Sequence, residues 1–356
     1  MQEFRSELLD WYYISKRDLP WRNSRDPYHI WLSEIMLQQT RVEQAKPYFE
    51  RFVEAFPTVC DLADAPQHNV MMLWEGLGYY SRARNMHRAA KMMKERYGGR
   101  VPDNYDSILE LPGVGPYTAA AVSSIAFGLP HAVVDGNVIR VLTRYSGTDG
   151  DVRTTAVKNE LDTLAHELLH RQKPGDYNQA LMELGAIICT PHTPDCVSCP
   201  LQTGCIACNT SRTGTIPYKS PKKKIPHYDI AVGIIQNSGG QLLIALRPDD
   251  VMLGGLWEFP GGKNKNGESL EETVRRELKE ELDVDVAVTG FFLKLNHAYS
   301  HFKITLHAYF CEILHGDPKP AASRQLQWVH RHQLAGYPFP KANRRLTHAL
   351  MEGTDY

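Results

Sequence analysis

Apolar residues recur three or four positions apart through most of the first 209 residues. This spacing places them on one face of a helix and predicts that this part of the chain is all α. The clearest stretch is 29–52. It follows Asp26-Pro27, a pair typical of a helix cap with proline in the first turn. Further helices are expected over residues 68–96, 104–111, 116–127, 136–146, 154–171 and 176–188.

The pattern changes after residue 226. Short runs rich in β-branched and aromatic residues replace the helical spacing, which is typical of strands. One amphipathic helix, 268–282, interrupts them, so an α+β region follows the helical one. Strands are expected over residues 229–237, 241–248, 301–314 and 325–330.

The two patterns meet in a segment of linker composition, 210–226, which holds three prolines and four lysines. A chain of 356 residues is also too long for one typical hydrophobic core. We therefore expect a multidomain protein, with an all-α domain over residues 1–209, a linker over 210–226 and an α+β domain over 227–356.

Composition restricts the class of protein less than the pattern does. The chain is 42% hydrophobic and 23% charged, which is ordinary for a soluble globular protein. It has no apolar run near the roughly 20 residues of a membrane span and no secretory signal at its start, so the interior of a cell is the expected location. The net charge of −1 neither indicates nor excludes nucleic acid as a partner.

Five of the seven cysteines fall in one short stretch, which indicates a metal site rather than a set of disulfides in a reducing interior. The spacing C-x6-C-x2-C-x5-C suits four thiolates on one tetrahedral Zn²⁺ or on a 4Fe-4S cluster. The paired CxxC motifs favour zinc, but the residues between them are fewer than in most such zinc sites. Spacing alone leaves both metals open. The five cysteines are Cys189, Cys196, Cys199, Cys205 and Cys208.

Residues 106–128 have the pattern of a helix, a glycine turn and a second helix. Gly113 and Gly115 let the backbone turn without a Cβ clash, and their N–H groups, with the start of the second helix, can point at an anion. A buried structural turn is the alternative. The stretch is similar to the helix-hairpin-helix motif that binds the DNA backbone.

Several of these motifs occur in one order along the chain. Together they resemble the adenine DNA glycosylases of the MutY type, within the endonuclease III superfamily, over about residues 4–208. The motifs are SEIMLQQTRV (33–42), GLGYYSRARN (76–85), LPGVGPYTA (111–119), VVDGNVIRVL (133–142) and the cysteine loop 189–205. The resemblance implies a helix-hairpin-helix glycosylase domain with a 4Fe-4S cluster on Cys189, Cys196, Cys199 and Cys205. Cys208 lies outside the family pattern and is expected to be a bystander.

Breaking an N-glycosidic bond requires an acid for the leaving base and support for an oxocarbenium-like centre, and two carboxylates can supply both. Glu34 lies among apolar residues, which favours its protonated form and suits a general acid. By resemblance it protonates N7 of adenine, Asp135 stabilises C1′, and Tyr117 and Asn137 position these groups. The alternatives are a solvated helix residue for Glu34 and a helix cap for Asp135.

Tyr117 also separates two mechanisms within the superfamily. Relatives with lyase activity have a lysine at this place in the hairpin's second helix. Without an amine there, no Schiff base can form, so the resemblance implies a monofunctional glycosylase that uses water. The residue four positions after Asp135, where some relatives have lysine, is Ile139.

The target base lies inside a duplex, so the enzyme must flip it out and fill the gap. The resemblance assigns Tyr79 as the wedge and places Leu37, Gln39 and Thr40 in a loop beside the opposing 8-oxoguanine. It assigns further contacts with DNA or adenine to Arg17, Trp21, Arg22, Leu111, Gly113 and Gly115. The expected partner is double-stranded DNA with adenine opposite 8-oxoguanine or guanine, bound by a monomer in the bacterial cytoplasm and not at a membrane.

Residues 262–284 resemble the Nudix box, with Asp283 where that pattern has glycine. Glycine there would permit a left-handed turn that aspartate tolerates less readily. The resemblance implies a domain similar to the 8-oxo-dGTP hydrolase MutT that reads the base opposite adenine, with Tyr299, Ser300 and His301 as its recognition loop.

Glu277, Glu280 and Glu281 share one face of the helix in this box, and such a face can hold Mg²⁺. The alternative is a solvated acidic helix. Three other functions stay open: a Nudix-type nucleotide pyrophosphate hydrolase with a DNA-binding arm, a pyrimidine glycosylase/lyase of the endonuclease III type, and a non-catalytic DNA-binding module.

Overall fold

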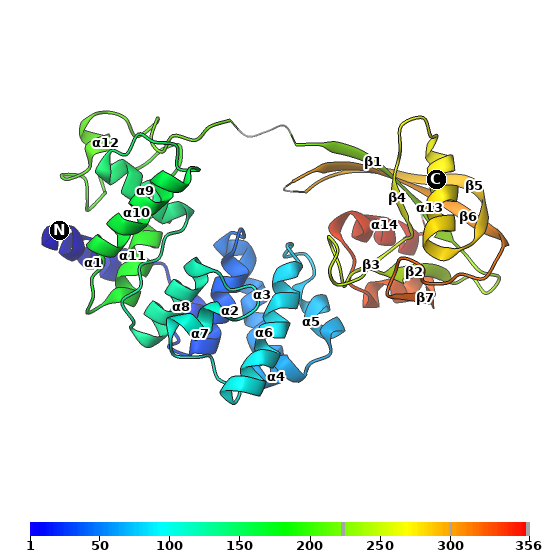
Figure 1. The fold of residues 1–356 in the computed structure, drawn as a ribbon, viewed down its shortest axis with the longest axis horizontal. Helices are drawn as coiled ribbons and strands as arrows, with labels where there is room; N and C mark the ends of the chain where they lie inside the picture. The colour runs from blue at the N-terminus through cyan, green and yellow to red at the C-terminus, as the bar shows by residue number, and fades with distance from the viewer. Residues whose placement is uncertain (222–224, 300, 354–356) are drawn as a thin grey trace. The chain divides into compact units, whose positions relative to one another are not determined.

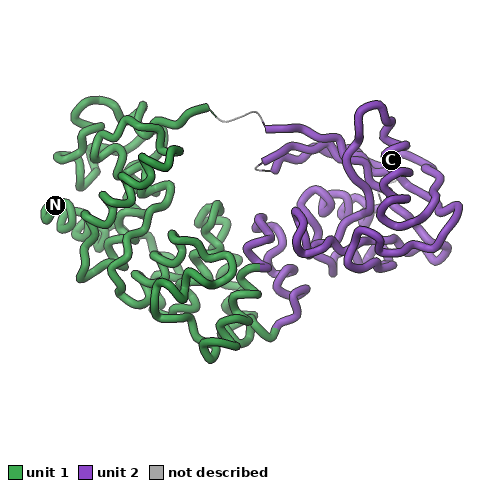
Figure 2. Tube along the Cα trace, in the orientation of Figure 1, with its two compact units in different colours: residues 1–64, 85–222 green, residues 65–84, 223–356 purple. Residues whose placement is uncertain are grey.

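The computed structural model describes residues 1–221, 225–299 and 301–353. The chain forms two compact units (Figure 2). The first comprises Met1–Asp64 and Asn85–Lys222, and the second comprises Ala65–Arg84 and Lys223–Tyr356. The change of unit falls within the expected linker. However, residues 65–84, which the helical pattern assigns to the N-terminal part, pack with the C-terminal part.

The first unit is helical, as the apolar spacing predicts (Figure 1). Its helices are α1 (Gln2–Ser15), η1 (Pro20–Arg22, a 3₁₀ helix), α2 (Pro27–Leu37), α3 (Val42–Ala55), α4 (Val59–Asp64), most of α6 (Ser81–Tyr97), α7 (Tyr105–Leu109), α8 (Pro116–Phe127), α9 (Gly136–Ser146), α10 (Thr155–Leu168), α11 (Pro174–Ile187) and α12 (Ile206–Asn209). None of the helices in the described parts of the chain combines the length and apolar character that a membrane crossing requires.

Helices α1, α9 and α11 share one hydrophobic core. Leu8 of α1, Leu142 of α9 and Leu184 of α11 are fully buried in it. Burial of one such side chain stabilises the fold by roughly 1.5–3 kcal/mol. This core fixes the start of α9 and the middle of α11, which carry residues of the candidate site.

Two of the expected helices are each broken in two. Stretch 29–52 forms α2 and α3, and stretch 68–96 forms α5 (Gln67–Trp74) and α6. Gln39 and Tyr79 lie at the breaks with φ of 58° and 49°, in the left-handed region, which ends a right-handed helix. The prediction of continuous helices is wrong here because the apolar spacing resumes in phase after each break.

The linker begins later than its composition predicts. Ile216 is buried, and its carbonyl oxygen accepts a hydrogen bond from Nε of Arg144 at 2.9 Å. The N–H of Val152 donates to the carbonyl oxygen of Tyr218 at 3.2 Å. The first part of segment 210–226 is therefore packed within the first unit, because its carbonyl oxygens accept hydrogen bonds from the Arg144 side chain and the Val152 backbone there.

The second unit holds two sheets. One has strand order β4-β1-β6-β5, with β1 and β6 parallel and the other pairs antiparallel, and the other has order β3-β2-β7. The strands are β1 (His227–Ile235), β2 (Leu242–Leu246), β3 (Trp257–Glu258), β4 (Gly261–Lys263), β5 (Asp285–Ala298), β6 (Lys303–His315) and β7 (Gln325–Val329). The α+β prediction is confirmed, and β1, β2, β6 and β7 coincide with predicted strands.

Helix α13 (Leu270–Leu282) matches the helix expected at 268–282. It begins with a capping box, in which Ser269 and Glu272 each bind the other's backbone N–H. Asp283 ends it in the left-handed conformation, at φ 59° and ψ 34°. Asp283 therefore adopts the left-handed turn for which the Nudix pattern has glycine. Asp283 makes the turn, and its carboxylate lies 3.4 Å from Nζ of Lys279.

Segment 65–84 packs on the C-terminal residues within the second unit. The carboxylate of Glu75 accepts a hydrogen bond from the N–H of Phe339 at 3.1 Å and pairs with Arg344 at 2.6 Å. The hydroxyl of Tyr80 donates to the carbonyl oxygen of Phe339 at 3.4 Å. Further contacts join Gln67 to Asp249, Arg84 to Gly254 and His68 to Tyr337. The segment therefore belongs to the second unit by these contacts, although the residues before and after it in the chain belong to the first.

Candidate active site

A pocket of about 160 Å³ in the first unit gathers most of the residues that the sequence predicts for catalysis. It lies where α2, α8, α9 and α11 approach one another. Predicted residues in its wall are Arg17, Trp21, Arg22, Glu34, Leu37, Thr40, Tyr117, Asp135 and Asn137. Gln39 does not line it.

Glu34 lies on α2 and is 5% exposed. Burial raises the pKa of its carboxyl to about 7, because the charged form is poorly solvated. The hydroxyl of Tyr117 donates to Oε2 of Glu34 at 2.7 Å and opposes this shift. The negative charge of Asp135 raises the pKa of Glu34 further, and Arg22 lowers it. A carboxyl with this pKa holds its proton in a large fraction of molecules at neutral pH.

Asp135 is both a helix cap and a wall of the pocket. One carboxylate oxygen accepts from the N–H of Val138 at 2.7 Å and caps α9, and the other accepts from Nδ2 of Asn137 at 2.9 Å. Burial raises the pKa of Asp135, and these two hydrogen bonds oppose the shift. A helix cap was the alternative to a catalytic role for this residue. In the structure Asp135 is the cap, and the capping hydrogen bond holds its carboxylate in the pocket wall.

Arg140 fixes the side chain that orients Asp135. Its Nη2 donates to Oδ1 of Asn137 at 2.9 Å and to the carbonyl oxygen of Gly185 at 2.6 Å. Its Nε donates to the carbonyl oxygen of Cys189 at 2.6 Å. Asn137 thus presents its amide nitrogen to Asp135 because Arg140 occupies its oxygen.

Glu183 is a residue of the pocket that the sequence analysis did not identify. Its side chain is 1% exposed and pairs with Arg17 at 2.7 Å and with Arg22 at 2.8 Å. The hydrogen bonds from these two arginines outweigh burial and lower the pKa of Glu183 to about 2. Glu183 therefore stays charged and holds both arginines in the pocket wall. Its place in an apolar stretch of α11 was the available signal.

The five clustered cysteines surround one small cavity in the first unit. Arg144 donates from Nη1 to Sγ of Cys189 at 3.3 Å, and the thiol of Cys205 donates to the carbonyl oxygen of Arg144 at 3.5 Å. Cys208, expected to be a bystander, lines the same cavity. The cavity is lined by Cys189, Cys196, Cys199, Cys205 and Cys208 together with Arg144, Ile188, Pro194, Asp195, Gln202 and Thr213.

These thiols suit an iron–sulfur cluster by donor type and by facing one cavity. Among residues 1–221, 225–299 and 301–353, no group of three or more His, Cys, Asp or Glu side chains has the arrangement of a site for a metal ion.

The predicted hairpin is formed by α7 and α8. Gly113 has φ 80°, and a Cβ there would lie 2.7 Å from Cβ of Asn85, so the turn requires glycine. Leu111 is buried beneath it, and Gly115 is the N-cap of α8. The first turn of α8 leaves backbone N–H groups without helical partners, which suits a phosphate.

Tyr79 belongs to the second unit, in the loop between α5 and α6. Its ring lies 5.4 Å from the guanidinium of Arg82, which also lies over the ring of Trp74 at 5.1 Å. Arg82 further donates to the carbonyl oxygen of Gly78 at 3.1 Å. The loop is therefore held in a defined conformation that presents Tyr79 at its turn.

The predicted recognition loop is the tip of the hairpin of β5 and β6. Tyr299 stacks on Phe302 with ring centroids 4.8 Å apart, and its N–H donates to the carbonyl oxygen of Phe302 at 2.8 Å. His301 is exposed at the tip. Ser300 lies outside the described residues.

In the segment that resembles the Nudix box, residues 262–284, Arg276 forms ion pairs with three of the carboxylates. It pairs with Glu268 and Glu277 at 2.7 Å each and with Glu280 at 3.3 Å. Glu281 is set apart from this network. It accepts from the N–H of Gly261 at 3.0 Å, and burial, followed by the charge of a neighbouring carboxylate, raises its pKa to about 7. The three predicted Mg²⁺ ligands therefore have different environments.

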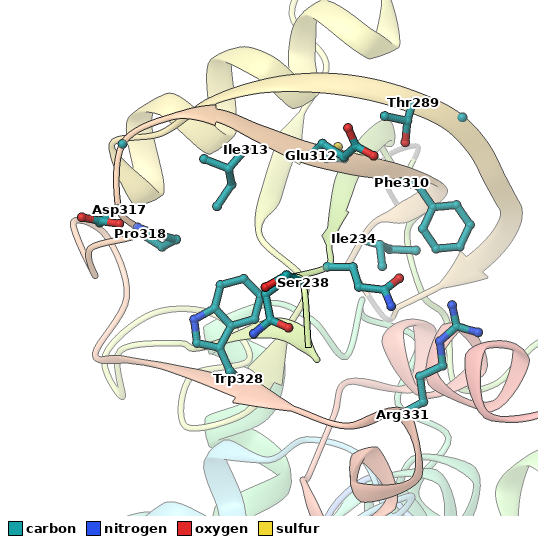
Figure 3. Close-up of a pocket in the computed structure, with 15 residues that line it drawn as sticks. Ile234, Ser238, Thr289, Phe310, Glu312, Ile313, Asp317, Pro318, Trp328 and Arg331 are labelled. Atoms are coloured by element: carbon teal, nitrogen blue, oxygen red, sulfur yellow. The ribbon is translucent and has the colours of Figure 1, made fainter. Parts of the chain in front are cut away.

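A larger hollow of about 970 Å³ lies elsewhere in the second unit. Figure 3 shows Trp328 and Arg331 on one side of it and Phe310 and Ile313 on the other. None of the predicted site residues lines this hollow. Size therefore does not mark the site, whereas the convergence of buried titratable groups does.

Comparison with known proteins agrees with both halves of this description. The family of helix-hairpin-helix (HhH-GPD) superfamily base excision DNA repair proteins matches residues 32–167, and the NUDIX domain family matches residues 231–349. Among solved structures, a thermostable thymine-DNA glycosylase is 35% identical over 59% of this chain and 96% of its own, with a TM-score of 0.53. An endonuclease III in complex with DNA is 25% identical over 59% and 97%, with a TM-score of 0.50. The protein is a DNA N-glycosylase in which a Nudix-like domain follows the glycosylase domain along the chain.

Curated relatives define the family more closely. Adenine DNA glycosylase from Mus musculus is 34% identical, with 91% of this chain and 74% of the relative covered. The Homo sapiens protein is 34% identical over 92% and 70%, and that of Buchnera aphidicola from Acyrthosiphon pisum is 35% identical over 84% of both. The chain belongs to the adenine DNA glycosylase family.

Proposed function

We propose that the protein hydrolyses the N-glycosidic bond of adenine mispaired with 8-oxoguanine or guanine in double-stranded DNA. The observation that carries this proposal is the buried Glu34 carboxyl, with its pKa near 7, facing the same pocket as Asp135. The names of the curated relatives support adenine as the base removed. The solved endonuclease III structures with DNA support DNA as the partner.

Glu34 acts as the general acid in this proposal. The protonated carboxyl gives its proton to N7 of the flipped adenine, so that the base departs neutral. The resulting carboxylate then accepts a proton from the water that attacks C1′. Tyr117 holds Oε2 of Glu34 throughout, because its hydroxyl donates to that oxygen.

Asp135 supports the positive charge that develops on the sugar. The hydrogen bonds from Val138 and Asn137 favour its charged form, and Glu34 is neutral until it gives its proton to the base. A fixed negative charge beside the reacting carbon stabilises an oxocarbenium-like centre. Two carboxyls in different environments thus take the two roles.

We infer that the enzyme is monofunctional. The pocket is lined by residues of the described part of the chain, and no lysine is among them. The residue at the lyase position of the family is Tyr117, which has no amine. Water is therefore the nucleophile, and strand cleavage at the site requires added alkali.

The proposal assigns the remaining residues to contacts with the flipped adenine and with the DNA. Arg17, Trp21 and Arg22 line the adenine pocket, with the arginines held by Glu183. The hairpin of Leu111, Gly113 and Gly115 grips the backbone of the DNA, Tyr79 is the wedge, and Gln39 and Thr40 face the opposing base. The enzyme works on DNA as a monomer in the cytoplasm.

The Nudix-like domain reads the base opposite adenine through Tyr299, Ser300 and His301 in this proposal. Arg276 pairs with Glu277 and Glu280, two of the three carboxylates predicted to hold Mg²⁺, and this supports a reader over a hydrolase because those two already have a positive partner. Cys189, Cys196, Cys199 and Cys205 hold a 4Fe-4S cluster whose role is to shape the loop that carries them.

The test is single-turnover excision on a duplex with adenine opposite 8-oxoguanine, quenched with and without alkali. We expect cleavage at the adenine only after alkali, and a loss of about 10²–10⁴-fold in rate for Glu34→Gln, because general acid catalysis contributes that much. Glu54→Gln, an exposed carboxyl on α3, is the matched control and should leave the rate unchanged.

Two results would contradict the proposal. Cleavage without alkali would indicate a lyase. An intact adenine together with Mg²⁺-dependent hydrolysis of free 8-oxo-dGTP would make the acidic helix the active site.

A further inference from the structure

The buried carboxylate of Glu183 binds two guanidinium groups in the wall of the catalytic pocket. Its Oε1 accepts hydrogen bonds from the backbone N–H of Arg17 at 2.9 Å and from Nε of Arg17 at 2.8 Å, and its Oε2 accepts from Nη2 of Arg17 at 2.7 Å. Arg22 donates from Nη1 to Oε1 at 3.1 Å and from Nη2 to Oε2 at 2.8 Å. Both arginines are therefore held in bidentate geometry by one carboxylate.

The two arginines differ in their exposure to water. The side chain of Arg17 is 33% exposed, whereas that of Arg22 is 10% exposed. The guanidinium of Arg22 also lies over the ring of Tyr12 at 5.7 Å, and its Nη1 donates to the carbonyl oxygen of Arg17 at 3.1 Å. Because water screens a buried charge less than an exposed one, Arg22 is the arginine whose charge acts more strongly within the pocket.

Glu34 faces titratable and charged groups from three other elements. These are Arg22 of η1, Tyr117 of α8 and Asp135 at the N-cap of α9. Burial raises the pKa of Glu34 to about 7, and the positive charge of Arg22 opposes this shift by favouring the carboxylate, which cannot protonate a base. A positive charge in the pocket wall also opposes the positive charge that adenine gains when N7 takes up the proton. An uncompensated Arg22 would thus act against acid catalysis in two ways.

We propose that Glu183 is a positioning residue for base excision, which pairs with Arg22 and Arg17 so that their positive charge does not deprotonate the general acid Glu34. This inference rests on the proposed function, in which protonated Glu34 starts the reaction. Glu183 acts through the arginines rather than on the substrate. Burial raises the pKa of Glu183, but the hydrogen bonds from the arginines outweigh it and lower that pKa to about 2. Glu183 therefore stays charged over the whole range in which Glu34 titrates.

The test is the pH dependence of single-turnover excision, with enzyme in excess over a duplex that has adenine opposite 8-oxoguanine. Glu183→Gln nearly keeps the size of the side chain and removes its charge. We expect the falling limb of the rate to move to lower pH by about one unit, at the low end of what a neighbouring charge produces. On that limb the rate is then about tenfold below that of the wild type, because the protonated fraction of Glu34 falls tenfold for each unit.

Further variants separate the charge of Glu183 from its packing. Glu183→Asp keeps the charge on a shorter side chain, so it should leave the limb in place even where the rate falls at every pH. Arg22→Gln removes the cation and should move the limb to higher pH, and combining it with Glu183→Gln should return the limb towards its wild-type position. Glu43→Gln, an exposed carboxyl in the first turn of α3, is the matched control and should leave the profile unchanged.

A uniform loss of rate in Glu183→Gln, with the limb in its wild-type position, overturns the inference. Equal shifts in Glu183→Asp and Glu183→Gln do so as well. If Glu183→Gln does not fold, Arg22→Gln decides, because an unchanged or downward limb in that variant overturns the inference. Wild-type protein that leaves adenine in place, or whose rate has no falling limb near pH 7, overturns the proposed function and the inference with it. That result differs from a wild-type limb that Glu183→Gln does not move.

Discussion

The hydroxyl of Tyr117 and the burial of Glu34 act on one proton in opposite directions. Burial favours the neutral carboxyl, and the hydrogen bond at 2.7 Å favours the carboxylate. Their balance sets the pKa near 7, where the group can both give a proton and take one back. The pH dependence of excision should therefore report this balance.

Tyr117→Phe should move that dependence to higher pH. Glu34 must be protonated to act, so single-turnover excision should fall as pH rises through about 7. Removal of the hydroxyl removes a contact that lowers the pKa of Glu34, so its pKa rises and the falling limb shifts upward. The measurement is the excision rate from mildly acidic to mildly alkaline pH.

Tyr13→Phe is the control, because Tyr13 donates to the carboxylate of Asp176 at 2.8 Å on the exposed surface. An unchanged or downward shift for Tyr117→Phe would show that burial and the hydrogen bond do not control this proton as described.

For individual residues, the sequence predicted which carboxyl groups lie together in the pocket. It did not predict which residue fixes the arginines of the pocket wall. Glu34, Asp135, Tyr117 and Asn137 were each identified from motifs, and the structure brings all four to one pocket. Glu183 was missed, because a glutamate in a helix is usually solvated, and only the fold shows that two distant arginines reach it.

Among the elements, the turns between helices proved hardest to predict. Helices over 116–127 and 136–146 were predicted with their observed bounds, because clear start and stop residues flank them. Stretches 29–52 and 68–96 were not resolved into two helices each, because the breaks at Gln39 and Tyr79 depend on left-handed backbone at single non-glycine residues. Both breaks carry residues predicted to contact DNA.

Strand β5 was missed for a different reason. Residues 285–298 alternate poorly between apolar and polar, and their pairing with β6 shifts register at three points. A search for alternating apolar and polar residues fails on such a strand, because each register shift interrupts the alternation. The strand is recognised only by its pairing with β6. Helix α14 (Lys341–Met351) was likewise not predicted.

The ion pair between Glu75 and Arg344 is one of the contacts that attach segment 65–84. Glu75 is half-buried, and burial raises its pKa, while Phe339 and Arg344 favour the charged form. Arg344→Met removes the charged partner that lies 2.6 Å from that carboxylate. We expect a loss of roughly 1–3 kcal/mol in local stability, between that of an exposed and of a buried pair.

The measurement is amide hydrogen exchange over residues 67–80, which should become faster in Arg344→Met. The neighbouring Arg345→Met removes an exposed arginine that binds the carbonyl oxygen of Asn296, and it should leave this segment unchanged. Equal exchange in both variants would mean that the ion pair does not hold the segment.

For the whole molecule, the division into units does not follow the order of the chain. The proposed acid Glu34 belongs to the first unit, whereas the proposed wedge Tyr79 belongs to the second, with the proposed reader of the opposing base. Composition places a linker at 210–226, and the change of unit falls within it. No local signal shows that residues 65–84 have partners as far along the chain as Asp249 and Gly254.

This arrangement bears on how the protein behaves when its chain is cut. A specific protease site introduced within 221–226 would sever the connection between residues 1–221 and 227–356. It would leave intact the packing of 65–84, on the N-terminal fragment, against Phe339 and Arg344, on the C-terminal one. The two fragments should therefore co-elute in size-exclusion chromatography after complete cleavage, and Arg344→Met should promote their separation. Separate elution of the unmodified pair would contradict this expectation. A protein with this property can be expressed as two genes whose products find each other, and backbone continuity at the linker becomes dispensable for its assembly.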